Sequence, residues 1–172
     1  MLWPKLVRSL VSRPLTDPAP PLSEDIAAAL RVRLEAASQR RLGRSLSIRH
    51  VDAGSCNGCE LELNALGNVV HDLERFGLRF VPSPRHADIL LVTGPLTRNM
   101  RVALDRARAA TPEPCFVVAL GDCAVDGGVF KSSYAAEGGV PAALPVDLLI
   151  PGCPPTPTQI LQGLLALMEA NA

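Results

Sequence analysis

The sequence predicts an α/β domain built on an open parallel sheet with helices on both faces. Strand-like and helix-like segments alternate from residue 45 to residue 168, a pattern that produces parallel sheets covered by helices. Three of the strand-like segments are continuous apolar runs, as expected for strands that are buried on both faces. The length of 172 residues suits one such domain with an added tail.

The elements follow one another with short connections. The first is a helix over residues 24–42, which are rich in good helix formers and lie between Ser23, a candidate N-cap, and Gly43. Strand-like segments then occupy residues 45–51, 78–81, 87–93, 115–120 and 146–150, and helix-like segments occupy residues 60–76, 98–110 and 158–168. The apolar runs ILLV, FVVAL and LLI predict that the last three strands are central in the sheet.

The last helix has its own start signal. Thr156 is expected to cap it, Pro157 to occupy the first helical position, and Gln159 to complete a capping box three residues after the cap. We therefore expect this helix to begin at Pro157.

The first 23 residues are set apart from the domain. Residues 14–23 hold four prolines and predict an extended linker, so the α/β domain spans residues 24–172. Ahead of the linker lies an amphipathic leader that suits contact with a partner or a membrane surface, or else a frayed chain end. Its apolar members at helical spacing are Leu2, Trp3, Leu6, Val7 and Leu10.

Composition and charge exclude several classes of function. Lys plus Arg and Asp plus Glu both total 17, so no general positive field attracts nucleic acid. The chain start is too interrupted by charge for a signal peptide, and no segment suits a membrane span. No dinucleotide fingerprint or P-loop motif occurs, and no nucleophile, base and orienter are arranged as in a hydrolase. We expect a cytoplasmic protein whose five cysteines are reduced.

Three stretches of the sequence share one form, an apolar strand followed by a glycine and a cysteine. They are HVDAGSC, ending at Cys56, VVALGDC, ending at Cys123, and LLIPGC, ending at Cys153. Because parallel strands point the same way, the loops at their carboxyl ends gather along one edge of the sheet, where such folds bind ligands. With Cys59, which forms a CxxC with Cys56, four thiols are predicted to meet at this edge.

Four thiolates around one centre suit zinc or an iron-sulfur cluster. A structural zinc site usually uses two close pairs of cysteines, whereas here one CxxC joins two isolated cysteines, a spacing that favours a 4Fe-4S cubane. A thioredoxin-like dithiol is the alternative for the CxxC, but it leaves Cys123 and Cys153 without a role. A cysteine taken alone is commonly a buried apolar residue. We assign that interpretation to Cys115, which starts a strand at the end opposite the glycine turns.

Four motifs in the chain together resemble the small subunit of membrane-bound, energy-converting NiFe-hydrogenases of the formate hydrogenlyase type. The motifs are SCNGCE, SPRHADILLVTG, GDCAVDGG and PGCPPTP, within residues 44–168. The 20 kDa 4Fe-4S subunit of respiratory complex I has the same fold and motif order. The resemblance implies a flavodoxin-like open sheet with one 4Fe-4S cluster at the carboxyl edge of the strands. The implied ligands are Cys56, Cys59, Cys123 and Cys153.

The first motif distinguishes two branches of this family. The complex I subunit has adjacent cysteines there, whereas this chain has the CxxC of hydrogenase small subunits, so the resemblance favours a hydrogenase. It implies a subunit without a complete active site, which passes electrons from a formate or ferredoxin-like donor to a NiFe large subunit that reduces protons. The implied partners are that large subunit, a ferredoxin-like iron-sulfur subunit and membrane subunits, on the cytoplasmic side of the inner membrane. A complex I-like quinone oxidoreductase subunit and a structural zinc module remain the alternatives.

Several charged residues near the motifs have less specific patterns. Glu60 directly follows Cys59 and is a candidate for relaying a proton near the cluster, with Asp122 and Asp126 as weaker candidates, although carboxylates at such positions are commonly caps or surface charges. His86 is expected to cap or pack at a strand entrance. A basic run is expected to form a solvated helix face, or else a partner contact, and its members are Arg98, Arg101, Arg106 and Arg108.

Overall fold

The computed structural model describes residues 45–171, together with residues 29, 32, 33 and 36. The predicted leader and linker, residues 1–23, lie outside the described residues, as does most of the helix predicted over residues 24–42. The four separate residues are helical, and one of them, Arg33, forms an ion pair with Glu169 (2.7 Å between Nη2 and Oε2). None of the described helices is long and apolar enough to cross a membrane.

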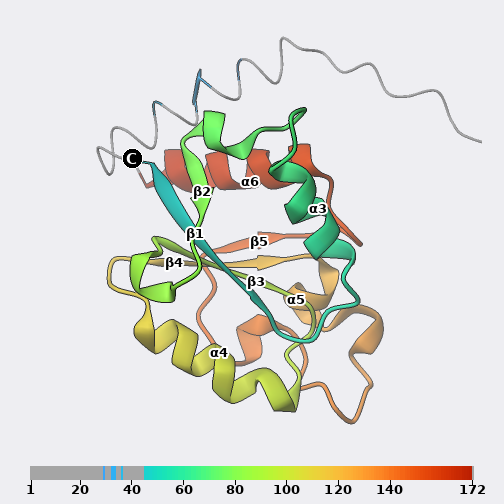
Figure 1. The fold of residues 1–172 in the computed structure, drawn as a ribbon. Helices are drawn as coiled ribbons and strands as arrows, with labels where there is room; N and C mark the ends of the chain where they lie inside the picture. The colour runs from blue at the N-terminus through green and yellow to red at the C-terminus, as the bar shows by residue number, and fades with distance from the viewer. Residues whose placement is uncertain (1–28, 30–31, 34–35, 37–44, 172) are drawn as a thin grey trace, which may run out of the picture.

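Five parallel strands form one sheet in the described part of the chain (Figure 1). The strands are β1 (Leu46–Asp52), β2 (Leu78–Phe80), β3 (Ile89–Thr93), β4 (Phe116–Leu120) and β5 (Leu148–Ile150). Their order across the sheet is β2-β1-β3-β4-β5. This is the order of the flavodoxin-like doubly wound sheet, whose ligand crevice opens at the carboxyl ends of β1 and β3. The predicted fold class is therefore confirmed.

Helices cover both faces of this sheet (Figure 1). The α-helices within residues 45–171 are α3 (Gly58–Leu66), α4 (Arg98–Ala110), α5 (Asp122–Asp126) and α6 (Pro157–Ala170). Helices α3 and α6 share one hydrophobic core, and α4 and α5 share the other. Alternate residues of β3 divide between them, since Ile89 and Leu91 join the first core and Leu90 and Val92 join the second. An all-apolar strand is what a sheet covered on both faces requires, because successive side chains point to opposite faces.

Short 3₁₀ turns complete the described elements. They are η1 (Leu73–Phe76), η2 (Pro84–His86), η3 (Gly128–Phe130) and η4 (Val140–Ala142). The helix predicted over residues 60–76 is wrong in its second half, because α3 ends at Leu66 and only η1 follows. The side chain of Asn68 accepts the backbone N–H groups of Val70 and His71 (both 2.9 Å), a local turn that competes with a continuing helix.

The position of β5 also differs from the prediction. The apolar run LLI predicts a central strand, but β5 lies at the edge of the sheet, and Leu149 is 47% exposed. The apolar character of β5 comes from one face only, because Leu148 and Ile150 pack on the α6 side. Helix α6 approaches this strand so closely that a Cβ added at Gly163 would lie 2.8 Å from Ile150 Cδ1.

The predicted start of α6 is confirmed. Thr156 Oγ1 accepts the backbone N–H of Gln159 (3.4 Å), and Gln159 Oε1 accepts the backbone N–H of Thr156 (2.8 Å). This reciprocal capping box, with Pro157 as the first helical residue, fixes where the chain leaves the loop of Cys153 and enters the helix.

Candidate metal centre

The four predicted cysteines lie in three loops at the carboxyl edge of the sheet. Cys56 and Cys59 follow β1, Cys123 follows β4, and Cys153 follows β5. Cys56 and Cys153 are exposed, Cys59 is half-buried, and Cys123 is only 8% exposed. The parallel strands thus deliver these loops to one side of the molecule, as the strand, glycine and cysteine pattern predicts.

The thiols are close enough to influence one another's ionisation. Burial, the charge of Glu60 and the thiols of Cys123, Cys56 and Cys153 together raise the pKa of Cys59 to about 12. Burial also raises the pKa of Cys123, with further contributions from Cys153 and Cys56. Each thiolate formed here opposes the next one. A cationic metal centre among the sulfurs removes that opposition, since coordinated thiols are deprotonated.

Gly121 brings the loop after β4 against Cys59. Its φ of +87° lies in the region that favours glycine, and an added Cβ would stand 2.5 Å from Cys59 Sγ. The loops of Cys59 and Cys123 are therefore in direct contact, and only a residue without a side chain fits between them.

Asp122 joins the loop of Cys123 to the loop of Cys153. Its carboxylate accepts the backbone N–H of Gly152 at 2.8 Å, and its own backbone N–H donates to the Gly152 carbonyl at 2.9 Å. Asp126, the other weaker candidate for a proton relay, is exposed and binds the side chain of Lys131 (3.0 Å). In the structure Asp122 therefore holds two cysteine loops together, and Asp126 forms a surface ion pair.

Hydrogen bonds between residues that are close in sequence hold the loop of Cys56 in place. Asp52 Oδ1 accepts the backbone N–H groups of Gly54 (2.8 Å) and Ser55 (2.7 Å), and Ser55 Oγ accepts the N–H of Asn57 (3.1 Å). Asn57 has a φ of 72°, the left-handed conformation that turns the chain into α3. The helix begins at Gly58, so Cys59 lies in its first turn, where the positive end of the helix dipole favours a thiolate.

A cavity of about 580 Å³ opens beside Cys123 and Cys153, and Asp126, Gly128 and Val129 also line it. The backbone N–H of Val129 donates to the sulfur of Cys123, which favours the thiolate and lowers the pKa of that group against the effect of burial. Among the described residues, no three His, Cys, Asp or Glu side chains converge closely enough to hold a single metal ion.

The remaining candidates lie away from this edge. Cys115 precedes β4 at the amino end of the strand, where it is half-buried and not fully buried as predicted. Burial is the main cause of its raised pKa. His86 is exposed in η2. In the basic run, Arg101 pairs with Asp105 and Glu137, and Arg108 pairs with Glu113. Ion pairs of this kind are typical of a solvated face.

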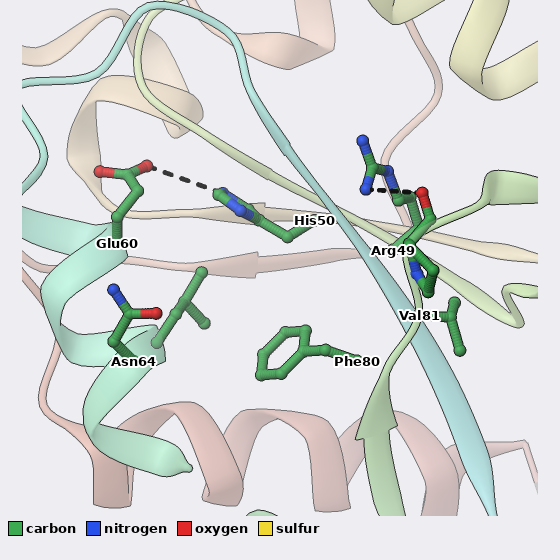
Figure 2. A pocket seen from close by; sticks show the side chains of 8 residues that line it. Arg49, His50, Glu60, Asn64, Phe80 and Val81 are labelled. Atoms are coloured by element: carbon green, nitrogen blue, oxygen red, sulfur yellow. Dashed lines mark hydrogen bonds and ion pairs between the residues drawn. The ribbon is translucent and has the colours of Figure 1, made fainter. Parts of the chain in front are cut away.

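Sequence reasoning missed the residues that hold Glu60. Ser55 Oγ donates to Glu60 Oε2 at 2.6 Å, and Thr93 Oγ1 at the end of β3 donates to Glu60 Oε1. His50 on β1 points at the same carboxylate, with 3.6 Å between Nε2 and Oε1 (Figure 2). The sequence did contain a pattern that indicates these contacts, because His50 and Thr93 are polar residues near the carboxyl ends of predicted strands.

The comparison with protein families covers the four cysteines of this edge. The family model described as NADH ubiquinone oxidoreductase, 20 Kd subunit, matches residues 56–167, which include all four cysteines. The chain belongs to this family. The predicted family is therefore confirmed.

Relatives within the 20 Kd subunit family are components of oxidoreductase complexes. The chain is 45% identical to formate hydrogenlyase subunit 7 of Escherichia coli, over 79% of this chain and 54% of that protein. It is 44% identical to the probable membrane-bound hydrogenase subunit mbhJ of Pyrococcus furiosus, over 76% of this chain and 78% of that protein. It is also 44% identical to an NADH-quinone oxidoreductase subunit of Desulfovibrio desulfuricans, over 74% of this chain and 68% of that protein. The chain thus spans about half the length of the first of these relatives.

A solved structure shows the same fold. It is that of the membrane-bound sulfane sulfur reductase, an archaeal respiratory membrane complex, and one of its chains matches with a TM-score of 0.65 and 32% sequence identity. The match covers 83% of this chain and 74% of that chain. Relatives of the 20 Kd subunit family therefore serve in complexes with different final reactions.

Proposed function

We propose that this chain is the electron-transfer small subunit of a membrane-bound NiFe-hydrogenase complex of the formate hydrogenlyase type. The main support is the gathering of four cysteines from three loops at one sheet edge, where their thiols oppose one another's ionisation. Cys56, Cys59, Cys123 and Cys153 would hold one 4Fe-4S cluster. When bound, such a cluster supplies one-electron transfer.

The donor set fits a cubane. Each cysteine of a 4Fe-4S site binds a different iron atom, so its ligands stand farther apart than ligands that share one ion. Two features of this chain suit such a cluster. The backbone N–H of Val129 already points at the sulfur of Cys123, and α3 begins beside Cys59. Both would stabilise negative charge on the cluster and tune its potential.

Exposed apolar side chains near the cysteines support a partner surface. Val129, which lines the cavity beside Cys123 and Cys153, is 78% exposed, and the neighbouring Phe130 is 37% exposed. Leu61, two residues after Cys59, is 61% exposed. Covering these side chains would exclude water from the sulfurs and bring a redox centre of the partner close. We assign this surface to the large subunit, with a ferredoxin-like subunit as electron donor.

Two observations favour hydrogenase over quinone chemistry. The chain has the CxxC of hydrogenase small subunits, and two of the relatives named above are hydrogenase or hydrogenlyase subunits. The match to an NADH-quinone oxidoreductase subunit keeps a complex I-like quinone oxidoreductase as the second candidate. In either case the chain would lie on the cytoplasmic side of the membrane, bound to membrane subunits and without a complete active site of its own.

The first experiment is anaerobic purification of the full chain, followed by metal analysis and EPR spectroscopy. We expect about four irons and four sulfides per chain, with an EPR signal on reduction. A colourless, iron-free protein with stoichiometric zinc would eliminate electron transfer.

An experiment on the complete complex decides between a hydrogenase and a complex I-like quinone oxidoreductase. Co-purification of a large subunit that contains nickel, together with hydrogen production, is the expected result. A nickel-free large subunit and quinone-dependent turnover would instead select the second candidate.

A further inference from the structure

Asn57 and Gly58, which lie between Cys56 and Cys59, form the single Asn-Gly pair of the sequence. An asparagine followed by glycine is chemically labile, because no side chain shields the glycine nitrogen and the backbone rotates freely at this residue. Asn57 is exposed, and its side chain makes no capping hydrogen bond to α3. Its amide group is therefore accessible to water and is not held by the helix.

The backbone nitrogen of Gly58 is available as well. Gly58 is the first residue of α3, and the first N–H groups of a helix have no acceptor within it. A Cβ added at Gly58 would lie 3.6 Å from Cys56 Sγ and 3.9 Å from Pro154 Cβ, which are ordinary contact distances. Gly58 is also not among the glycines with a positive φ. Alanine should therefore fit at this position without disturbing the fold.

The backbone conformation of Asn57 opposes a reaction between the two residues in the folded loop. Its ψ is 0°, which places the nitrogen of Gly58 beside the backbone nitrogen of Asn57 and away from the side chain. Closing a ring requires rotation about this bond, which breaks the hydrogen bond from the Leu61 N–H to the Asn57 carbonyl (3.1 Å). The rotation also moves Cys59 relative to Cys56. A metal centre bound by both cysteines would resist it.

We propose that Asn57 deamidates in the cluster-free chain and that a bound cluster prevents this modification; the second part rests on the proposed function. The nitrogen of Gly58 attacks Cγ of Asn57, a bond between these atoms replaces the bond from Cγ to Nδ2, and ammonia leaves with the amide proton of Gly58. Water then opens the succinimide at one of its two carbonyl carbons. The product is aspartate, or isoaspartate when the main chain runs through Cγ.

Both products should weaken the cysteine site. Each adds a negative charge between Cys56 and Cys59, where the thiols already oppose one another's ionisation. Isoaspartate also lengthens the main chain between these cysteines by one carbon atom, so the two sulfurs lose the spacing of the CxxC. A subunit that stays without its cluster thus becomes unable to accept one.

The test is anaerobic incubation of the purified full chain in mildly alkaline buffer, with its cluster and after removal of the iron by a chelator. Peptide mass spectrometry and an isoaspartate assay then measure the modification. We expect Asn57 to be modified in the cluster-free sample and at least about tenfold more slowly in the loaded sample, where ring closure requires local opening of the loop. Asn68 should stay unmodified in both, because its side chain accepts the N–H groups of Val70 and His71.

Two variants test the reacting atoms and the consequence. Gly58→Ala, whose added methyl group meets only ordinary contacts, should lose most of the modification at Asn57. Asn57→Gly suits the φ of 72° and has no amide group to lose. After cluster-free incubation, iron uptake on reconstitution should fall in the wild type in proportion to the modified fraction. Asn57→Gly should retain the iron uptake of its own fresh sample.

The outcomes separate this inference from the proposed function. An unmodified Asn57 in the cluster-free wild type would overturn the inference, and equal rates with and without the cluster would overturn the protection. Equal losses of iron uptake in the wild type and in Asn57→Gly would overturn the consequence. A wild-type chain that binds no iron in any sample would overturn the proposed function, whereas modification of Asn57 in that chain would still support the labile Asn-Gly pair.

Discussion

The cysteines at the two ends of the central strands have different neighbouring residues. At the carboxyl edge, Cys59 is surrounded by three other thiols and by Glu60, and all of them raise its pKa. At the amino end of β4, the neighbours of Cys115 are charged residues, with Arg108 and Glu113 foremost. Burial is the largest influence on both thiols. Burial therefore does not distinguish Cys59, a proposed ligand, from Cys115, whereas the presence of other thiols does.

The largest effect is expected when serine replaces one of the proposed ligand cysteines. We expect Cys123→Ser or Cys153→Ser to abolish hydrogen production by the complex and the EPR signal of this cluster, because a cubane needs all four ligands. Cys115→Ser should retain both activity and signal. Equal losses in Cys115→Ser would show that the ligand set is assigned wrongly.

Gly121→Ala tests the contact between the two cysteine loops. The new methyl group would stand 2.5 Å from Cys59 Sγ at a φ of +87°, so Cys59 must move. A residue with a side chain is strained by about 1–3 kcal/mol at this φ and ψ, which glycine alone adopts readily, and overpacking adds about 1–3 kcal/mol. We expect most of the bound iron to be lost, as measured by iron content and visible absorbance.

Gly138→Ala is the matched control for this variant. Gly138 also has a positive φ, +102°, but a Cβ added there meets no atom within 4 Å. Gly138→Ala should therefore introduce backbone strain but retain the bound iron. Similar iron loss in both variants would mean that strain, and not the contact with Cys59, is responsible.

The sequence is informative where one pattern requires one geometry. A glycine and a cysteine after each of three apolar strands place Cys56, Cys123 and Cys153 at one edge, because parallel strands share a direction. The capping box at Thr156 is equally local, and the structure confirms it.

Features that depend on several elements are harder to predict. An apolar run shows that a strand packs against other elements, but it does not show whether a neighbouring strand lies on each side. For that reason the prediction did not identify β5 as an edge strand. The helix after Cys59 is too long in the prediction because helical periodicity hides the turn at Asn68. The contacts of Glu60 with His50 and Thr93 join α3 to β1 and β3, and no local pattern contains them.

Asp122→Ala should have a moderate effect, since it removes the acceptor for the Gly152 N–H but leaves all four thiols in place. An unsatisfied, partly buried N–H costs about 1–3 kcal/mol. We expect a lower free energy of unfolding and faster cluster loss in air, because the loops of Cys123 and Cys153 are no longer joined by this carboxylate. Asp105→Ala, which removes one exposed ion pair of α4, should change neither quantity measurably. Identical behaviour of the two variants would remove the role assigned to Asp122.

His50→Gln should produce the smallest change, in the acid stability of the domain. Burial lowers the pKa of His50 in the folded chain below its ordinary value of 6.5, so the unfolded chain binds this proton more readily. Stability is therefore unaffected above the unfolded pKa and is lost as the pH falls below it, with a slope of at most about 1.4 kcal/mol per pH unit for one group. Urea unfolding at about pH 7 and pH 5.5 should show a smaller acid loss in His50→Gln than in the wild type, whereas His86→Gln should match the wild type. An acid loss in His50→Gln as large as that of the wild type would mean that the fold does not hold this imidazole in its neutral form.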